Sequence, residues 1–67
     1  MTKEEIRGLS NEALVDIFGF AYEQKSLREV IAETDDTWKA KVKEIEEEIE
    51  MLREELNRRL KRSCLGL

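Results

Sequence analysis

The chain has 67 residues, of which 42% are charged and 40% apolar, with no histidine, no proline and a single cysteine. This length supports one small domain, and the cysteine and histidine counts exclude an internal disulfide and the ordinary zinc ligand sets. Sixteen acidic and twelve basic residues give a net charge of -4, which disfavours non-specific binding to nucleic acid.

The N-terminal residues Met1 to Glu5 are too polar for a signal peptide, and no run approaches the length of about 18 apolar residues that spans a membrane. We therefore expect a cytoplasmic protein. The absence of proline and the high charge content favour an all-α fold.

A short helix is predicted over residues 3–7. Thr2 and Glu5 form a capping-box pattern at its start, and Gly8 is a natural stop because a positive φ costs little at glycine.

A longer helix is predicted over residues 11–24, with Ser10 as its N-cap. Eight of the ten residues from Ala13 to Tyr22 are apolar, which is more than the single stripe of a surface helix. We expect this helix to be covered on more than one side by a second subunit or a partner. Gly19 within it indicates close backbone packing.

Two stretches are candidates for the turn that follows. Ser26 and Glu29 repeat the capping-box pattern, which predicts a turn at 24–26 and a short helix over 27–33. The second candidate is 34–37, whose short polar side chains compete for backbone groups, with Asp35 or Asp36 capping the next helix. We expect a break at one or both, and a continuous helix from Leu27 to Arg62 is the alternative because neither break contains glycine or proline.

The helix predicted over residues 36–63 has the strongest periodicity in the chain. Its apolar residues follow one another at intervals of three or four, which places them on one face. About two heptads are regular, as in a helical bundle or short coiled coil. We expect this face to be a self-association seam that joins two or more copies, formed by Trp38, Val42, Ile45, Ile49, Leu52, Leu56 and Leu60.

The predicted fold is a helical hairpin with a long, coiled-coil-like C-terminal helix that dimerises into a helical bundle. The expected core consists of Leu14, Ile17, Phe18, Ala21, Ile31, Trp38, Val42, Ile45, Ile49, Leu52 and Leu56.

No catalytic, cofactor or metal site is predicted. The chain has no histidine to activate Cys64 or a serine as a nucleophile, so we expect it not to be an enzyme. A set of glutamates could converge on a divalent metal, but lysines and arginines interleave with them, which favours a solvated face. These glutamates are Glu44, Glu46, Glu47, Glu48, Glu50, Glu54 and Glu55.

Residues 64–67 fit a prenylation box in outline, with a basic cluster upstream. The simpler interpretation is that the bases complement the dipole of a helix C-terminus. They are Arg58, Arg59, Lys61 and Arg62.

Residues 26–43 support an alternative function, a small helix-turn-helix DNA-binding regulator with Lys39, Lys41 and Lys43 on its recognition helix. Trp38 and its apolar neighbours would be needed for packing, which leaves few side chains for base edges, so nucleic-acid binding is less favoured.

Two parts of the chain resemble the small Sda-type inhibitors of sporulation histidine kinases. Residues 9–31 match without gaps at Leu9, Ser10, Glu12, Leu14, Ala21, Glu23, Arg28 and Ile31. A second match, similar to the family's second helix, includes Ile49, Glu50, Glu55, Leu56, Arg58 and Arg59. The chain is also similar to small helical-hairpin proteins of Gram-positive prophages. The resemblance implies an antiparallel hairpin that docks on a kinase's helical dimerisation domain, with Ser26 and Val30 at the family's contact positions.

The favoured interpretation is a small regulatory or inhibitory module that binds another protein through apolar helical surface not covered by the dimer. A structural coiled-coil module for self-assembly is the alternative. The candidate partner contacts are Phe20, Tyr22, Leu27 and Val30.

Overall fold

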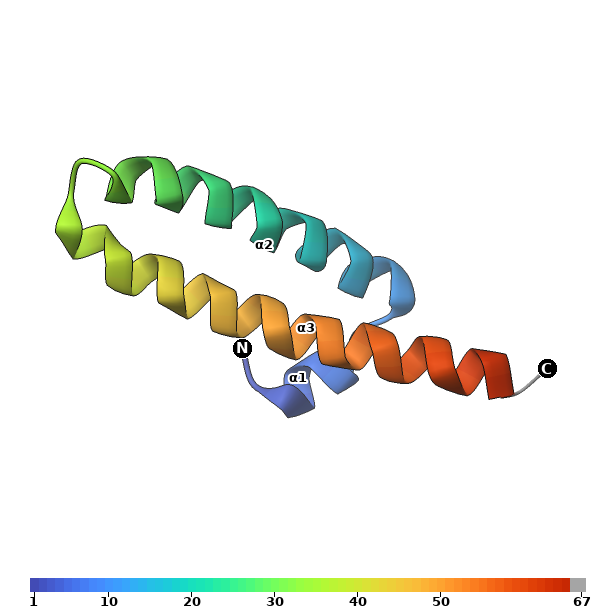
Figure 1. Ribbon diagram of the computed structural model, residues 1–67. Helices are drawn as coiled ribbons and strands as arrows, with labels where there is room; N and C mark the ends of the chain where they lie inside the picture. The colour runs from blue at the N-terminus through green and yellow to red at the C-terminus, as the bar shows by residue number, and fades with distance from the viewer. Residues whose placement is uncertain (66–67) are drawn as a thin grey trace.

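The computed structural model describes the backbone of residues 1–65 and the side chains of residues 1–61. It contains α1 (Lys3–Arg7), α2 (Asn11–Ala32), the 3-10 helix η1 (Asp36–Trp38) and α3 (Lys39–Leu65). Figure 1 shows α2 and α3 side by side as an antiparallel hairpin, with α1 packed against α3 near the open end. The predicted all-α hairpin with a long last helix is confirmed.

The two N-terminal helices begin where their caps predict. The Glu5 amide donates to Thr2 Oγ1 at 3.2 Å, and the Thr2 amide donates to Glu5 Oε1 at 3.3 Å, which completes the capping box. The Ala13 amide donates to Ser10 Oγ at 3.1 Å at the start of α2. Gly8 does end α1, but its φ of -78° shows that the expected positive φ was wrong.

The predicted turn at 24–26 and the separate helix at 27–33 are wrong, because α2 continues through both to Ala32. Ser26 and Glu29 satisfy a capping pattern, but without glycine or proline nothing forces the chain out of the helix. The close packing expected at Gly19 is also wrong. A Cβ at that position would meet no atom within 4 Å.

The hairpin turns at the second predicted stretch. The Thr34 and Asp35 amides both donate to the Ile31 carbonyl, at 3.1 and 3.0 Å, and end α2. Asp35 Oδ1 accepts from Thr37, at 2.7 Å from Oγ1 and 3.1 Å from the amide, and these hydrogen bonds lower the pKa of Asp35. Asp35 is thus one of the two caps expected for the helix that follows.

The core is thin and lies between α1, α2 and α3. Its buried side chains are Ile6, Leu14, Ala21, Ile45, Ile49 and Leu52. Leu9, Ile17, Phe18, Met51 and Leu56 pack against it while partly exposed. Five of the expected core residues are therefore buried, whereas Trp38 and Val42 are half-buried at the turn.

Three positions depart from the predicted core. Ile31 is 39% exposed, so its assignment to the core was wrong. Ile6 is buried and Leu9 half-buried, although neither was expected in the core. Over the described residues, no helix combines the length and apolar character needed to cross a bilayer.

Candidate protein-interaction face

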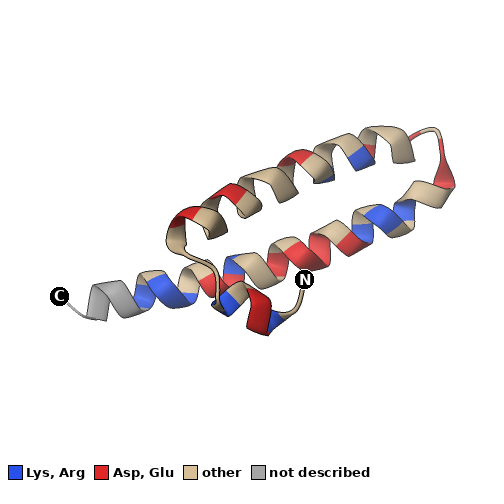
Figure 2. Ribbon diagram, turned by 180° about the vertical axis from the view of Figure 1, so that it is seen from behind, with Lys and Arg blue, Asp and Glu red and all other residues tan. Residues whose placement is uncertain are grey.

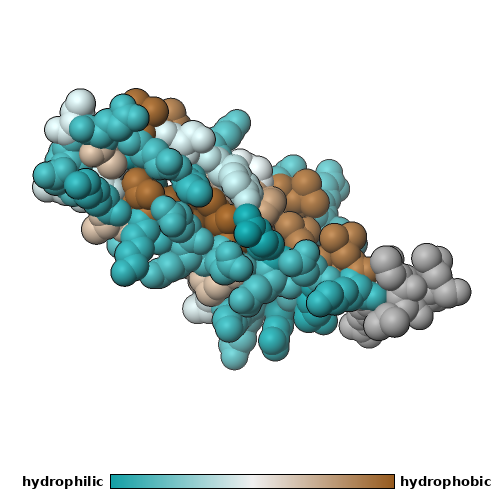
Figure 3. Space-filling view, in the orientation of Figure 1, coloured by the Kyte–Doolittle hydropathy of each residue, from teal (hydrophilic) through white to brown (hydrophobic). Residues whose placement is uncertain are grey.

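Large apolar side chains lie exposed along one side of α2, next to its contact with α3. Phe20, Leu27 and Val30 are 60%, 58% and 63% exposed, and Ile31 lies beside them. Phe20 and Leu27 are seven residues apart, so they lie on the same side of the helix two turns apart. Figure 3 shows apolar atoms at the upper edge of the molecule, over the last turns of α2. We call Phe20, Glu23, Leu27, Val30 and Ile31 the α2 face.

A pocket of about 270 Å³ adjoins the α2 face, between α2 and α3. Phe20 belongs to both the face and the pocket wall, and Ile17, Ala21, Ile45 and Leu52 supply further apolar lining. An apolar surface that continues into a pocket is the arrangement in which anchor residues of a binding partner are usually held.

Tyr22 was predicted to belong with Phe20, Leu27 and Val30, but it points to another side of α2. Two residues along a helix turn the side chain by about 200°. Tyr22 Oη accepts from Arg53 Nη2 at 2.6 Å, and its ring packs edge-on against Phe18 with centroids 4.9 Å apart. The structure therefore ties Tyr22 to α3, and the other three predicted contacts form one surface without it.

The charges that α2 exposes are all negative. Glu12, Asp16, Glu23 and Glu29 are exposed, whereas Lys25 and Arg28 are half-buried on the side toward α3. Arg28 Nη1 donates to the Lys41 carbonyl at 2.9 Å. The outer side of α2 thus combines apolar groups with carboxylates.

The outer side of α3 is different, because it exposes charged groups and no large apolar side chain before Leu60. Figure 2 shows bases at the turn end of α3, acids in its middle and bases again beyond them. Such a surface is well solvated. The two helices therefore present one side suited to water and one side with apolar groups exposed.

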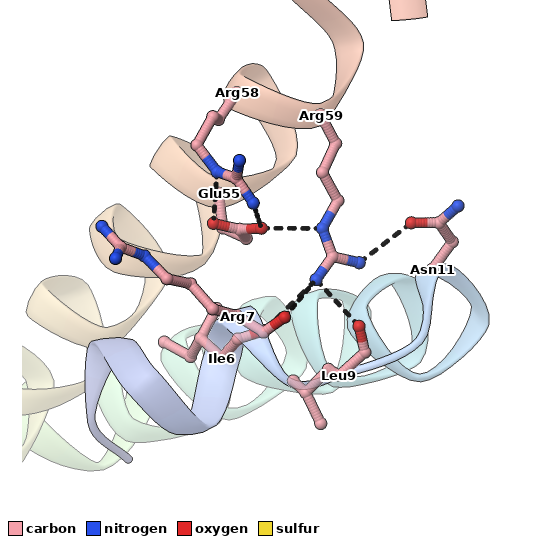
Figure 4. Close-up of polar contacts among 7 residues, drawn as sticks. All are labelled: Ile6, Arg7, Leu9, Asn11, Glu55, Arg58 and Arg59. Carbon is pink, nitrogen blue, oxygen red and sulfur yellow. Dashed lines mark hydrogen bonds and ion pairs between the residues drawn. The ribbon is translucent and has the colours of Figure 1, made fainter. Parts of the chain in front are cut away.

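A cluster around Glu55 fixes the open end of the hairpin (Figure 4). Glu55 is only 6% exposed and accepts from Arg58 Nε at 3.0 Å, Arg58 Nη2 at 2.7 Å and Arg59 Nε at 2.7 Å. The hydrogen bonds from Arg58, and then those from Arg59, lower the pKa of Glu55 to about 2. The solvated position predicted for Glu55 is therefore wrong.

Arg59 extends this cluster to the N-terminal segment. Its Nη1 donates to Asn11 Oδ1 at 2.9 Å, and its Nη2 donates to the Leu9 carbonyl at 2.8 Å. The Arg7 and Ile6 carbonyls accept from the same nitrogen at 3.2 and 3.4 Å. One guanidinium thus donates to the Arg7 carbonyl at the end of α1 and to the Leu9 carbonyl before α2, and holds the start of α2 against α3.

The predicted self-association seam is largely used within one chain. Ile45, Ile49 and Leu52 are buried against α1 and α2, and Trp38, Val42 and Leu56 are half-buried. Leu60 is 62% exposed. It lines a second pocket of about 230 Å³ with Asn11, Val15, Leu56 and Arg59.

The helix-turn-helix arrangement predicted for residues 26–43 is wrong. Residues 26–32 are the end of α2, which runs antiparallel beside α3 (Figure 1), whereas the helices of that motif cross at about 90 to 120°. Lys41 lies over the Trp38 ring at 4.2 Å, and Lys39 pairs with Asp36 at 3.2 Å. DNA binding itself stays a prediction.

Among the described residues, no three acidic or cysteine side chains are grouped so that they could hold a metal ion. The Cys64 thiol and the prenylation box at 64–67 lie outside the residues whose side chains are described.

Sequence reasoning missed two parts of this geometry. Glu23 was noted only as a matching position in the resemblance, although its spacing of three from Phe20 and four from Leu27 places it between them. The contacts of Arg59 with residues 6–11 join segments about fifty positions apart, and no local pattern indicates them. Comparison with protein-family models, curated proteins and solved structures finds no match to this chain.

Proposed function

We propose that the chain is a small regulatory or inhibitory protein of the cytoplasm that binds another protein through the α2 face and catalyses no reaction. The observation that carries the proposal is the exposure of Phe20, Leu27 and Val30 on one side of a helix whose opposite side forms the core. Helical faces with apolar residues at such spacing bind partner helices or grooves.

The contrast between the two helices supports this proposal. The outer side of α3 carries charged residues where the α2 face carries four large apolar ones, so lack of core volume alone does not account for the exposed groups. The resemblance to Sda-type inhibitors would make the helical dimerisation domain of a histidine kinase one such partner.

The test is to capture partners from the producing cell with two double variants. Phe20→Ala with Leu27→Ala removes apolar area from the α2 face. The control, Glu47→Ala with Glu54→Ala, also replaces two exposed residues by alanine, but on the outer side of α3. We expect the first pair to lose partners that the wild type and the second pair retain, with a loss of about tenfold or more in affinity at each central anchor. Retention of every partner by the first pair would refute the proposal, provided circular dichroism shows that both pairs fold.

Self-association is the second candidate, and the exposed Leu60 and Val15 beside the pocket at the open end favour it. Two copies that met there would cover both side chains. Sedimentation equilibrium should then show a dimer that Leu60→Ala weakens and Phe20→Ala does not. A wild-type monomer at high protein concentration would refute this candidate.

A further inference from the structure

A carboxylate lies in the middle of the α2 face. Glu23 follows Phe20 by three residues and precedes Leu27 by four, so the three side chains are neighbours on adjoining helical turns. Glu23 is exposed, and among the side chains of residues 1–61 none forms an ion pair or hydrogen bond with it. It is therefore hydrated when α2 is free.

Binding at Phe20 and Leu27 would remove water from this carboxylate. A buried charge is strongly unfavourable unless an opposite charge and hydrogen bonds compensate it. Neither base of α2 is its neighbour, because Lys25 and Arg28 lie two and five residues from Glu23, on other sides of the helix, and Arg28 Nη1 donates to the Lys41 carbonyl. The compensating cation must come from the partner.

The acidic residues near Glu23 also favour a positively charged partner. Asp16 precedes Phe20 by four residues and Glu12 precedes Asp16 by four, which extends the negative surface along the same side of α2. A second copy that presented its own α2 face would place acid against acid, which disfavours that pairing. Anionic lipid surfaces are disfavoured for the same reason.

From this arrangement, and resting on the proposed function, we infer that the partner is an amphipathic helix with a lysine or arginine between two apolar residues at helical spacing. The apolar residues contact Phe20 and Leu27, and the base pairs with Glu23. The distance from Phe20 to Ile31 is about 16 Å along the helix axis, which matches about three turns of such a partner.

The test uses a displayed library of amphipathic helices in which two leucines are fixed about two turns apart, on one side of the helix, and the positions between them are randomised. The library is selected against the wild type, Glu23→Lys and a control, Glu29→Lys. Glu29 is exposed on α2 but six residues from Glu23, so it projects from another side, and its change alters the net charge equally.

We expect the wild type and Glu29→Lys to select lysine or arginine between the leucines, and Glu23→Lys to select aspartate or glutamate there. A selected basic helix should bind the wild type about tenfold more tightly than the same helix with glutamine at that position, as expected for a charged hydrogen bond. The preference should decrease with added salt.

Other outcomes would overturn the inference in distinguishable ways. Helices that require Phe20 and Leu27 but show no basic preference would overturn the partner chemistry and leave the proposed function standing. If no selected helix depends on Phe20 or Leu27 for binding, both the inferred partner chemistry and the proposed function fail. A wild-type dimer that Phe20→Ala with Leu27→Ala dissociates would show that a second copy occupies the α2 face.

Discussion

Replacement of Leu52 by alanine tests whether the periodic face of α3 forms the core of a single chain. Leu52 is 0% exposed and lies between α2 and α3, so its truncation leaves a cavity. Leucine-to-alanine changes at such sites cost about 2 to 5 kcal/mol. A domain of this size rarely has more than about 3 to 5 kcal/mol of stability, so we expect Leu52→Ala to be largely unfolded at room temperature.

Leu27→Ala is the matched control, because it removes the same atoms from a side chain that is 58% exposed. Its free energy of unfolding should stay within about 0.5 kcal/mol of the wild type. Urea denaturation followed by circular dichroism measures both variants. Equal losses of stability in the two variants would refute the assignment of Leu52 to a core within one chain.

Three further predictions, one with a control variant, test other parts of the fold. Ser10→Ala should cost about 1 kcal/mol because it removes the N-cap of α2, whereas Ser26→Ala, the same change within the continuous helix, should be neutral or slightly stabilising in the same urea assay. Gly19→Ala should raise the free energy of unfolding by up to about 1 kcal/mol, because the site has space for a Cβ and a helical φ; destabilisation would show that the site is crowded. Glu55 has a pKa of about 2 in the folded chain against an ordinary 4.5, so folding favours its ionised form. The ionised Glu55 contributes fully to the free energy of unfolding when the pH is above 4.5, and this contribution is lost as the pH falls toward 2. Glu55→Gln should therefore reduce the decline in stability that urea denaturation measures between these pH values.

Local signals in the sequence predict much of the fold. The caps at Thr2 and Ser10 and the apolar spacing of α3 involve residues within one or two turns of each other, so they can be read without knowledge of tertiary contacts. The wrong prediction of a turn at 24–26 also came from a local pattern. A capping pattern shows that a helix could begin at Ser26, but residues 24–26 contain no glycine or proline that would end the helix before it.

The orientation of α2 could not be predicted, because apolar residues surround the helix and no single stripe identifies the core side. For this reason Ile31 was assigned to the core although it is exposed, and the separation of Tyr22 from Phe20 was missed. Ile6 was missed because a helix of five residues is too short to show a period. The exposure of Phe20 agrees with the excess of apolar residues from Ala13 to Tyr22, whereas Leu27 and Val30 lie beyond that stretch.

The contacts of Arg59 change how the hairpin opens. Two antiparallel helices joined by one turn ordinarily separate first at the ends that no loop connects. Here the Arg59 guanidinium joins residues 6–11 to the second half of α3, so hydrogen bonds also hold the helix ends that no loop connects. We therefore expect transient opening to begin toward residues 33–38, and the amide hydrogens of the second turn of α2 to exchange with solvent more slowly than those next to the loop.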